Sequence, residues 1–121
     1  MAIVNIEQWA KKANLSLDEA VRGITISLFS AVIMDTRVDT GRMRGNWQAS
    51  IGSPITIETD RTDKTGTATV SAMQSKVRSG SLNIMTNNVP YAEYWEQQDG
   101  MIAKNMARVS RIVNKEVRKV Q

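Results

Sequence analysis

Two glutamates in an aromatic segment are the residues whose type and spacing come nearest to those of a catalytic pair. Glu93 and Glu96 lie three positions apart, beside Tyr91, Tyr94 and Trp95, so a helix would place both carboxylates on one face. Paired carboxylates can act as general acid and general base. That face offers no nucleophile or metal ligand besides the acids themselves. The structural alternative is that the rings pack on a sheet or a neighbouring chain while the acids stay hydrated or pair with arginines.

The composition excludes most other chemistry. The chain has no cysteine and no histidine, which removes thiolate nucleophiles, the commonest general base and the commonest metal ligands. A phosphate-binding loop is not indicated, because neither Gly41 nor Gly45 is followed by Gly-Lys-Ser/Thr. The sequence therefore favours a protein that is not an enzyme and that needs no cofactor or metal.

The length and the apolar content predict one domain over residues 1–121. Hydrophobic residues make up 41% of the 121 residues, which is enough for a single modest core. The N-terminus lacks the basic and apolar regions of a signal peptide, and no apolar run approaches the roughly 20 residues that span a bilayer. We expect a soluble protein made in a cytoplasm.

The first forty residues predict two helices. Asn5 is a plausible N-cap for a short helix that ends near Asn14. Ser16 and Glu19 form a capping box, which predicts a second helix over residues 17–38. Its apolar positions cover more than a narrow stripe, so we expect cover on two sides: a sheet on one, and a neighbouring subunit or another helix of the chain on the other.

Alternation of apolar and polar residues predicts a mostly antiparallel sheet of about four strands with a long hairpin. Residues 73–80 have weak periodicity and fit either a mobile loop or a single helical turn. The predicted strands cover residues 44–53, 55–60, 67–72 and 81–86, with a polar hairpin tip at 61–66.

The last third of the chain predicts a short aromatic helix after Pro90 and an amphipathic helix from Met101 to the end. The fold class is therefore α+β. Residues 103–121 hold six cations and one anion, within a net charge of +4. This basic face could bind DNA phosphates, dock on an acidic protein ring or only be solvated. Its cations are Lys104, Arg108, Arg111, Lys115 and Arg118.

Two blocks of the sequence resemble a known family. The first is Val38-Asp39-Thr40-Gly41-Arg42-Met43-Arg44, and the second is Asn87-Asn88-Val89-Pro90-Tyr91-Ala92-Glu93-Tyr94-Trp95-Glu96. Both are similar to signatures of the tail-completion proteins of long-tailed bacteriophages, the minor tail protein Z-like group of the head–tail neck. One departure is that Gln97–Gly100 leads straight into the basic helix, where family members often have a glycine and a proline-bearing segment.

The resemblance implies a structural virion protein, made in the host cytoplasm, that completes the tail and joins it to the head connector. It implies a homo-oligomeric ring, hexameric in the particle, that contacts the tail-tube or terminator protein and the head-completion or connector protein. DNA would pass through without sequence-specific binding, and no membrane is involved. The alternatives are a tail-terminator ring and a small basic nucleic-acid-binding module that uses helix 101–121.

Within that reading, Arg42 and Arg44 are expected to hold the helix-to-strand corner against Glu93, Glu96 or an acidic neighbour. Sheet edges and the hairpin 61–66 are expected to continue from subunit to subunit. The interface candidates are Asp39, Arg42, Arg44, Trp47, Arg61, Lys64, Tyr91, Glu93, Tyr94, Trp95, Glu96, Arg108, Arg111 and Lys115.

Overall fold

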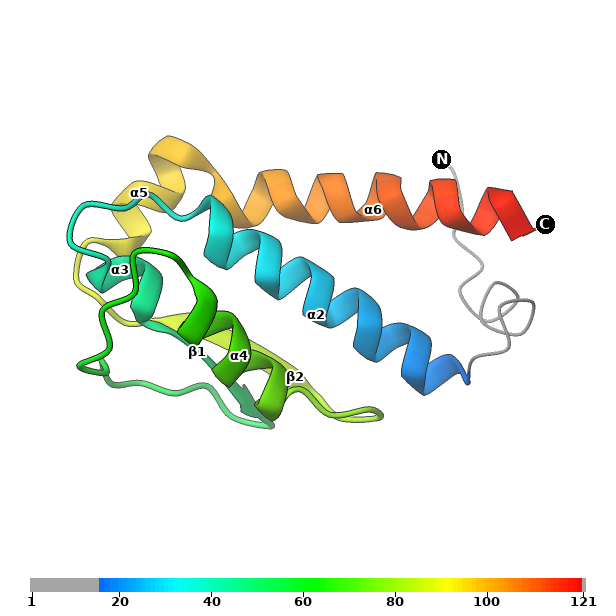
Figure 1. Ribbon diagram of the computed structural model, residues 1–121, viewed down its shortest axis with the longest axis horizontal. Helices are drawn as coiled ribbons and strands as arrows, with labels where there is room; N and C mark the ends of the chain where they lie inside the picture. The colour runs from blue at the N-terminus through cyan, green and yellow to red at the C-terminus, as the bar shows by residue number, and fades with distance from the viewer. Residues whose placement is uncertain (1–15, 121) are drawn as a thin grey trace.

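Helices cover one face of a small sheet in the computed structural model, which describes residues 16–120 (Figure 1). The short helix expected from Asn5 lies outside these residues. The architecture is mixed α+β, as the sequence predicts. Its elements are α2 (Leu17–Asp35), α3 (Arg42–Gly45), β1 (Trp47–Ile51), α4 (Thr67–Lys76), β2 (Asn83–Asn87), α5 (Ala92–Asp99) and α6 (Met101–Val120).

Helix α2 begins at its expected cap and ends three residues early. The Glu19 N–H donates to Ser16 Oγ at 3.1 Å, which satisfies one of the free donors of the first turn. The helix ends at Asp35, and Thr36 is extended. The buried Thr36 hydroxyl donates to the Val32 carbonyl at 2.7 Å and accepts from Trp47 Nε1 at 2.7 Å. These bonds fix the direction in which the chain leaves α2 toward the sheet.

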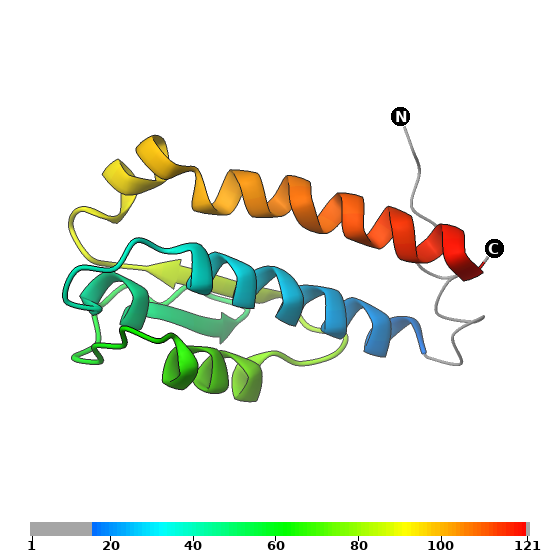
Figure 2. The same cartoon turned by 45° about the horizontal axis from the view of Figure 1, so that its top comes forward.

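The sheet has two antiparallel strands, with Trp47 opposite Asn87 and Ile51 opposite Asn83. Helix α2 packs against α4 and α6, and α4 packs against β1, so the helices gather on one side of the sheet (Figure 2). The core between them is built from Val32, Ile33, Met43, Trp47, Ala49, Met73, Val77, Val89, Ala92 and Met101.

The strand predicted over residues 55–60 is wrong, because this segment is irregular. Side chains rather than a backbone ladder hold it against the sheet. Gln48 Nε2 donates to the Ile57 carbonyl at 2.8 Å, and Thr86 Oγ1 donates to the Ile55 carbonyl at 3.1 Å. Alternation puts both donors on the sheet face opposite Trp47. The segment therefore crosses the face that the helices leave uncovered.

The strand predicted over residues 67–72 is also wrong, since these residues begin α4. Thr69, Met73 and Val77 are buried, and their spacing of four is helical. Residues 61–66 accordingly form a loop before a helix, not a hairpin tip. Residues 73–76 complete α4, and a loop follows to Asn83. The sheet therefore has two strands where about four were expected.

The two C-terminal helices are confirmed. Gly100, with a φ of +62°, separates α5 from α6. The Glu96 carboxylate accepts from the Ile102 N–H at 2.8 Å, so the end of α5 caps the start of α6. Helix α6 then runs along α2 (Figure 1). Two of its own side chains, Asn105 and Val109, are buried.

Candidate interaction surface

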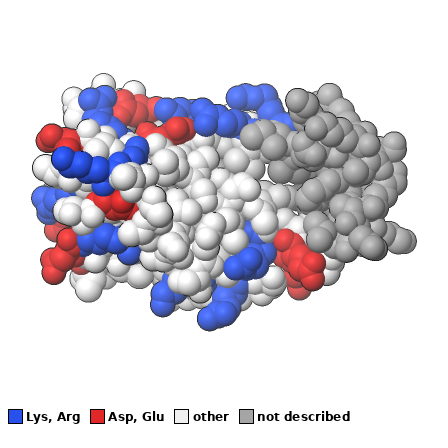
Figure 3. All heavy atoms as spheres, in the orientation of Figure 1, with Lys and Arg blue, Asp and Glu red and all other residues white. Residues whose placement is uncertain are grey.

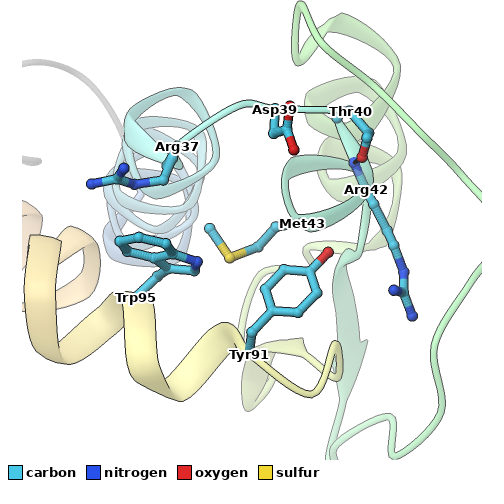
Figure 4. Close-up of a pocket in the computed structure, with 8 residues that line it drawn as sticks. Arg37, Asp39, Thr40, Arg42, Met43, Tyr91 and Trp95 are labelled. Carbon is cyan, nitrogen blue, oxygen red and sulfur yellow. Dashed lines mark hydrogen bonds between the residues drawn. The ribbon is translucent and has the colours of Figure 1, made fainter.

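The structure brings the two blocks of the resemblance together at one surface groove. The groove has a volume of about 390 Å³. In Figure 4, Met43 lies between the rings of Trp95 and Tyr91, below Asp39 and Thr40. The lining residues are Arg37, Asp39, Thr40, Gly41, Arg42, Met43, Tyr91 and Trp95.

A tight turn positions the first block. Gly41 has a φ of +89°, a conformation that glycine adopts without steric cost. The Arg42 N–H donates to Thr40 Oγ1 at 3.2 Å, and the Gly41 carbonyl accepts from the N–H groups of Gly45 and Asp63, both at 2.9 Å. The Gly41 carbonyl thus accepts both the first hydrogen bond of α3 and a hydrogen bond from the loop that contains Asp63.

Each arginine of the groove pairs with an acid and lies over an aromatic ring. Arg37 donates to both Asp99 oxygens at 3.0 Å and lies 3.8 Å from the centre of the Trp95 ring. The hydrogen bond from Arg37 lowers the pKa of Asp99. Arg42 pairs with Glu58 and lies 5.7 Å from the centre of the Tyr91 ring. Paired and stacked guanidinium groups hold the rims of the groove.

The expected pairing of Arg42 and Arg44 with Glu93 or Glu96 is wrong. Arg42 instead binds Glu58. Glu96 is occupied as the cap of α6, accepting from the N–H groups of Ile102 and Ala103. Glu93 is exposed, and within residues 16–120 no hydrogen bond reaches its carboxylate. The two glutamates therefore have separate environments.

Arg44 binds backbone carbonyls inside the fold and does not line the groove. Its guanidinium donates to the carbonyls of Met34 at 2.7 Å and Thr36 at 3.0 Å, and also to that of Lys64. The first two carbonyls belong to the last turn of α2 and its C-cap, where no helical donor remains. Arg44 therefore joins the end of α2 to the loop before α4.

Gly41 of the first block and Gly45 directly after the block allow that loop to approach. A Cβ on Gly45 would lie 2.4 Å from the Arg61 carbonyl oxygen, and one on Gly41 would lie 2.9 Å from the backbone of Asp63. Arg61 donates back to the carbonyls of Gly45 at 2.9 Å and Trp47 at 2.8 Å. Sequence reasoning missed this contact, because spacing alone does not say which distant backbone a glycine faces.

Asp63 fixes the start of α4. Its carboxylate accepts from the N–H groups of Gly66 at 2.9 Å and Thr69 at 2.8 Å, and from the hydroxyls of Thr69 at 2.8 Å and Thr65 at 3.3 Å. Burial raises the pKa of Asp63, but these donors outweigh burial, so the pKa lies below its ordinary value. The sequence signal was the set of short polar residues around Gly66, which also suits a hairpin tip.

The remaining candidates are spread over the molecule. Trp47 is 3% exposed and belongs to the core, whereas Tyr94 is 55% exposed with its ring edge-on to Trp95 at 4.8 Å. Lys64 is exposed in the loop before α4. Lys115 lies on α6 where only the backbone is described.

Cations follow one side of α6. Arg108 pairs with Asp35 at 3.2 Å, while Lys104 and Arg111 are exposed. Figure 3 shows blue side chains along the upper edge of the molecule, over α6, beside an uncharged area over α2. The uncharged area matches residues 23–34 of α2, which carry no charged side chain.

Comparison with known proteins adds no assignment. No family model, no curated protein and no solved structure matches the chain. Among the described helices, none has the length and apolar character needed to cross a bilayer. Over the same residues, three or more acidic side chains never converge as a metal site would require. The interpretation of the groove therefore depends on its own residues.

Proposed function

We propose that this chain is a structural protein of the bacteriophage neck that completes the tail and joins it to the head connector as a hexameric ring. One observation supports this most. The two sequence blocks that resemble tail-completion proteins are separated by more than forty residues, yet they line one exposed groove. The blocks also meet in the core through Met43 and Ala92, and the exposed groove beside that contact is the surface that they offer to a partner.

The groove suits contact with another protein. Tyr91 is 37% exposed, and large aromatic side chains beside arginines dominate the binding energy of protein interfaces. Asp39 is exposed, and its carboxylate has no hydrogen bond within the described residues, so it can accept from a partner. Arg37 and Arg42 are already held by acids and rings, which reduces the entropy lost when a partner binds.

The test is head–tail joining in the phage that encodes the chain. We expect Tyr91→Ala with Arg42→Ala to give folded protein but separate heads and tails, because both changes remove groove surface without touching the core. Gln98→Ala, at an exposed position of α5 outside the groove, is the matched control. Electron microscopy of lysates and plaque counts give the readout, and normal particles from the double variant would contradict the proposal.

The second candidate is a nucleic-acid-binding module, favoured by the cations along α6. Phosphate contacts would make its affinity fall steeply with salt. Duplex DNA binding measured across a salt series separates the candidates: useful affinity at physiological salt with a steep slope supports this module. The position of the chain in tails imaged by microscopy separates a completion ring from a terminator ring.

A further inference from the structure

The sheet has an open edge at β2. The Gly52 N–H donates to the Leu82 carbonyl at 3.0 Å, so in this antiparallel register the main-chain groups of Ile84 and Thr86 face β1. Those of Asn83, Met85 and Asn87 then face away. Within the described chain, no hydrogen bond reaches the outward N–H and C=O of Met85. The strand also lacks the lysine or proline that usually protects an edge.

A largely apolar groove runs beside that edge. It consists of two adjoining hollows, of about 340 Å³ and 180 Å³, that share Trp47, Met85 and Ile102 in their walls. Figure 2 shows β2 between β1 and α6, so the groove lies between the open edge and the helix. Met106, on the α6 wall, is 56% exposed. Open main-chain groups beside apolar pockets are the arrangement that accepts an added strand.

The chain also contains a strand-like segment that belongs to no sheet. Ile55, Ile57 and Thr59 alternate with polar residues, and the side chain of Ile57 is 72% exposed. In the part of the chain that the structure describes, residues 53–58 make no backbone–backbone hydrogen bond. Side chains hold the segment instead: Gln48, Thr86 and Asn88 donate to the carbonyls of Ile55 and Ile57, Asn46 accepts from the Thr59 N–H, and Glu58 pairs with Arg42. Addition of the segment to another sheet would exchange these side-chain contacts for backbone hydrogen bonds.

We propose that residues 55–59 of a second copy of this chain add to the open edge of β2 as an antiparallel strand, with Ile57 opposite Met85. This inference rests on the proposed ring. In that register Ile55, Ile57 and Thr59 share the sheet face of Met85 and point into the apolar groove. The Ile57 main chain then takes up the outward N–H and C=O of Met85.

Charge determines the direction of the added strand. Antiparallel pairing places Glu58 opposite Ile84 and Asp60 opposite Leu82, at the end of β2 where Arg78 is exposed. Arg78 adjoins that end, because its N–H donates to Asn83 Oδ1 at 2.9 Å. Parallel pairing would instead place both acids at the Asn87 end of β2, away from Arg78, and would lose this attraction.

The contact is heterologous, because each copy gives a segment at one place and receives one at another. Such contacts close into rings when the rotation between copies allows it. The contact therefore has no two-fold symmetry and can repeat from each subunit to the next around a ring.

Cysteine cross-linking tests the register directly, since the chain has no cysteine of its own. Ile57→Cys and Met85→Cys variants are prepared separately, mixed in equal amounts, allowed to assemble and oxidised. Directly opposed residues have Cα atoms within the range that a disulfide bridges. We expect a disulfide-linked dimer band in the mixture and at least a tenfold weaker band with Thr56→Cys in place of Ile57→Cys, since Thr56 points to the other face.

An Ile57→Asp variant gives a second readout. Because Ile57 is exposed, we expect its monomer to melt at the wild-type temperature while sedimentation shows loss of the oligomer. Oligomers that form without the Ile57–Met85 link, and that persist in Ile57→Asp, would overturn this inference and leave the proposed ring standing. A chain that stays monomeric at all concentrations and on isolated tails would overturn both.

Discussion

At the scale of single residues, Arg42 and Arg44 show that neighbouring arginines in one motif have different roles. Arg44 donates to three backbone carbonyls, whereas Arg42 meets an exposed glutamate and a ring. The motif therefore combines a residue that joins segments of the fold with a residue that shapes the groove.

We predict that Arg44→Ala lowers the free energy of unfolding by about 2 kcal/mol, because it leaves carbonyls at the end of α2 without donors. Arg42→Ala is the matched control and should leave the urea midpoint close to that of the wild type, since exposed ion pairs add little. Urea titration followed by circular dichroism measures both. Equal losses in the two variants would contradict the division of roles.

Asp63 makes the free energy of unfolding depend on pH. Its pKa is lower in the folded chain than in the unfolded one, so its stabilising effect is present above the unfolded pKa and is lost as pH falls through the folded pKa. We predict that the advantage of the wild type over Asp63→Asn in free energy of unfolding shrinks between about pH 5 and pH 2. Thermal melts of both proteins at several pH values check this, and a constant difference would contradict it.

At the scale of elements, the position of α3 depends on how closely the loop of residues 61–63 can approach. We predict that Gly45→Ala costs about 3 kcal/mol, because its Cβ would meet the Arg61 carbonyl oxygen at 2.4 Å. Gly23→Ala, in the middle of α2 with nothing within 4 Å of a Cβ, should instead stabilise by about 0.5–1 kcal/mol. Chemical denaturation compares the two, and a neutral Gly45→Ala would show that the loop can move away.

The sequence predicted the elements whose signals are local. Ser16 and Glu19 marked the start of α2, alternation marked β1 and β2, and the stripe of α6 was unambiguous. Helix α4 was missed because hydroxyl and apolar residues alternate over residues 67–72 as they would in a strand. Its helical state depends on Asp63 and on burial of Thr69 and Met73, which involve contacts across the fold.

The groove could be predicted only in part. The two blocks were found, but their meeting depends on how α5 packs beside α3, which no spacing reveals. The partner of Arg42 was predicted wrongly for a similar reason. Glu58 lies in residues 55–60, which alternation predicts to be a strand and which the structure shows to be irregular.

At the scale of the whole molecule, every described element contributes to one core around Thr36 or packs against it, including α4 through Met73 and β2 through Met85. The core draws Val32 from α2, Met43 from α3, Trp47 from β1 and Met101 from α6. Within the described residues there is no second cluster of comparable size. The elements should therefore unfold together.

We predict a single cooperative transition in urea, with coincident curves from tryptophan fluorescence and far-ultraviolet circular dichroism. Fluorescence reports on buried Trp47, whereas circular dichroism reports on all helices. A lower midpoint by circular dichroism would show that a helix, most simply α6, separates before the core opens.

The bare rim of β2 also has a cost for the free protein. A strand of five uncharged residues with outward main-chain groups can recruit any extended chain, including misfolded copies. The purified protein should therefore aggregate at high concentration unless a binding partner covers the open edge of β2. Expression together with its neighbours, rather than alone, would be the gentler way to make this protein in quantity.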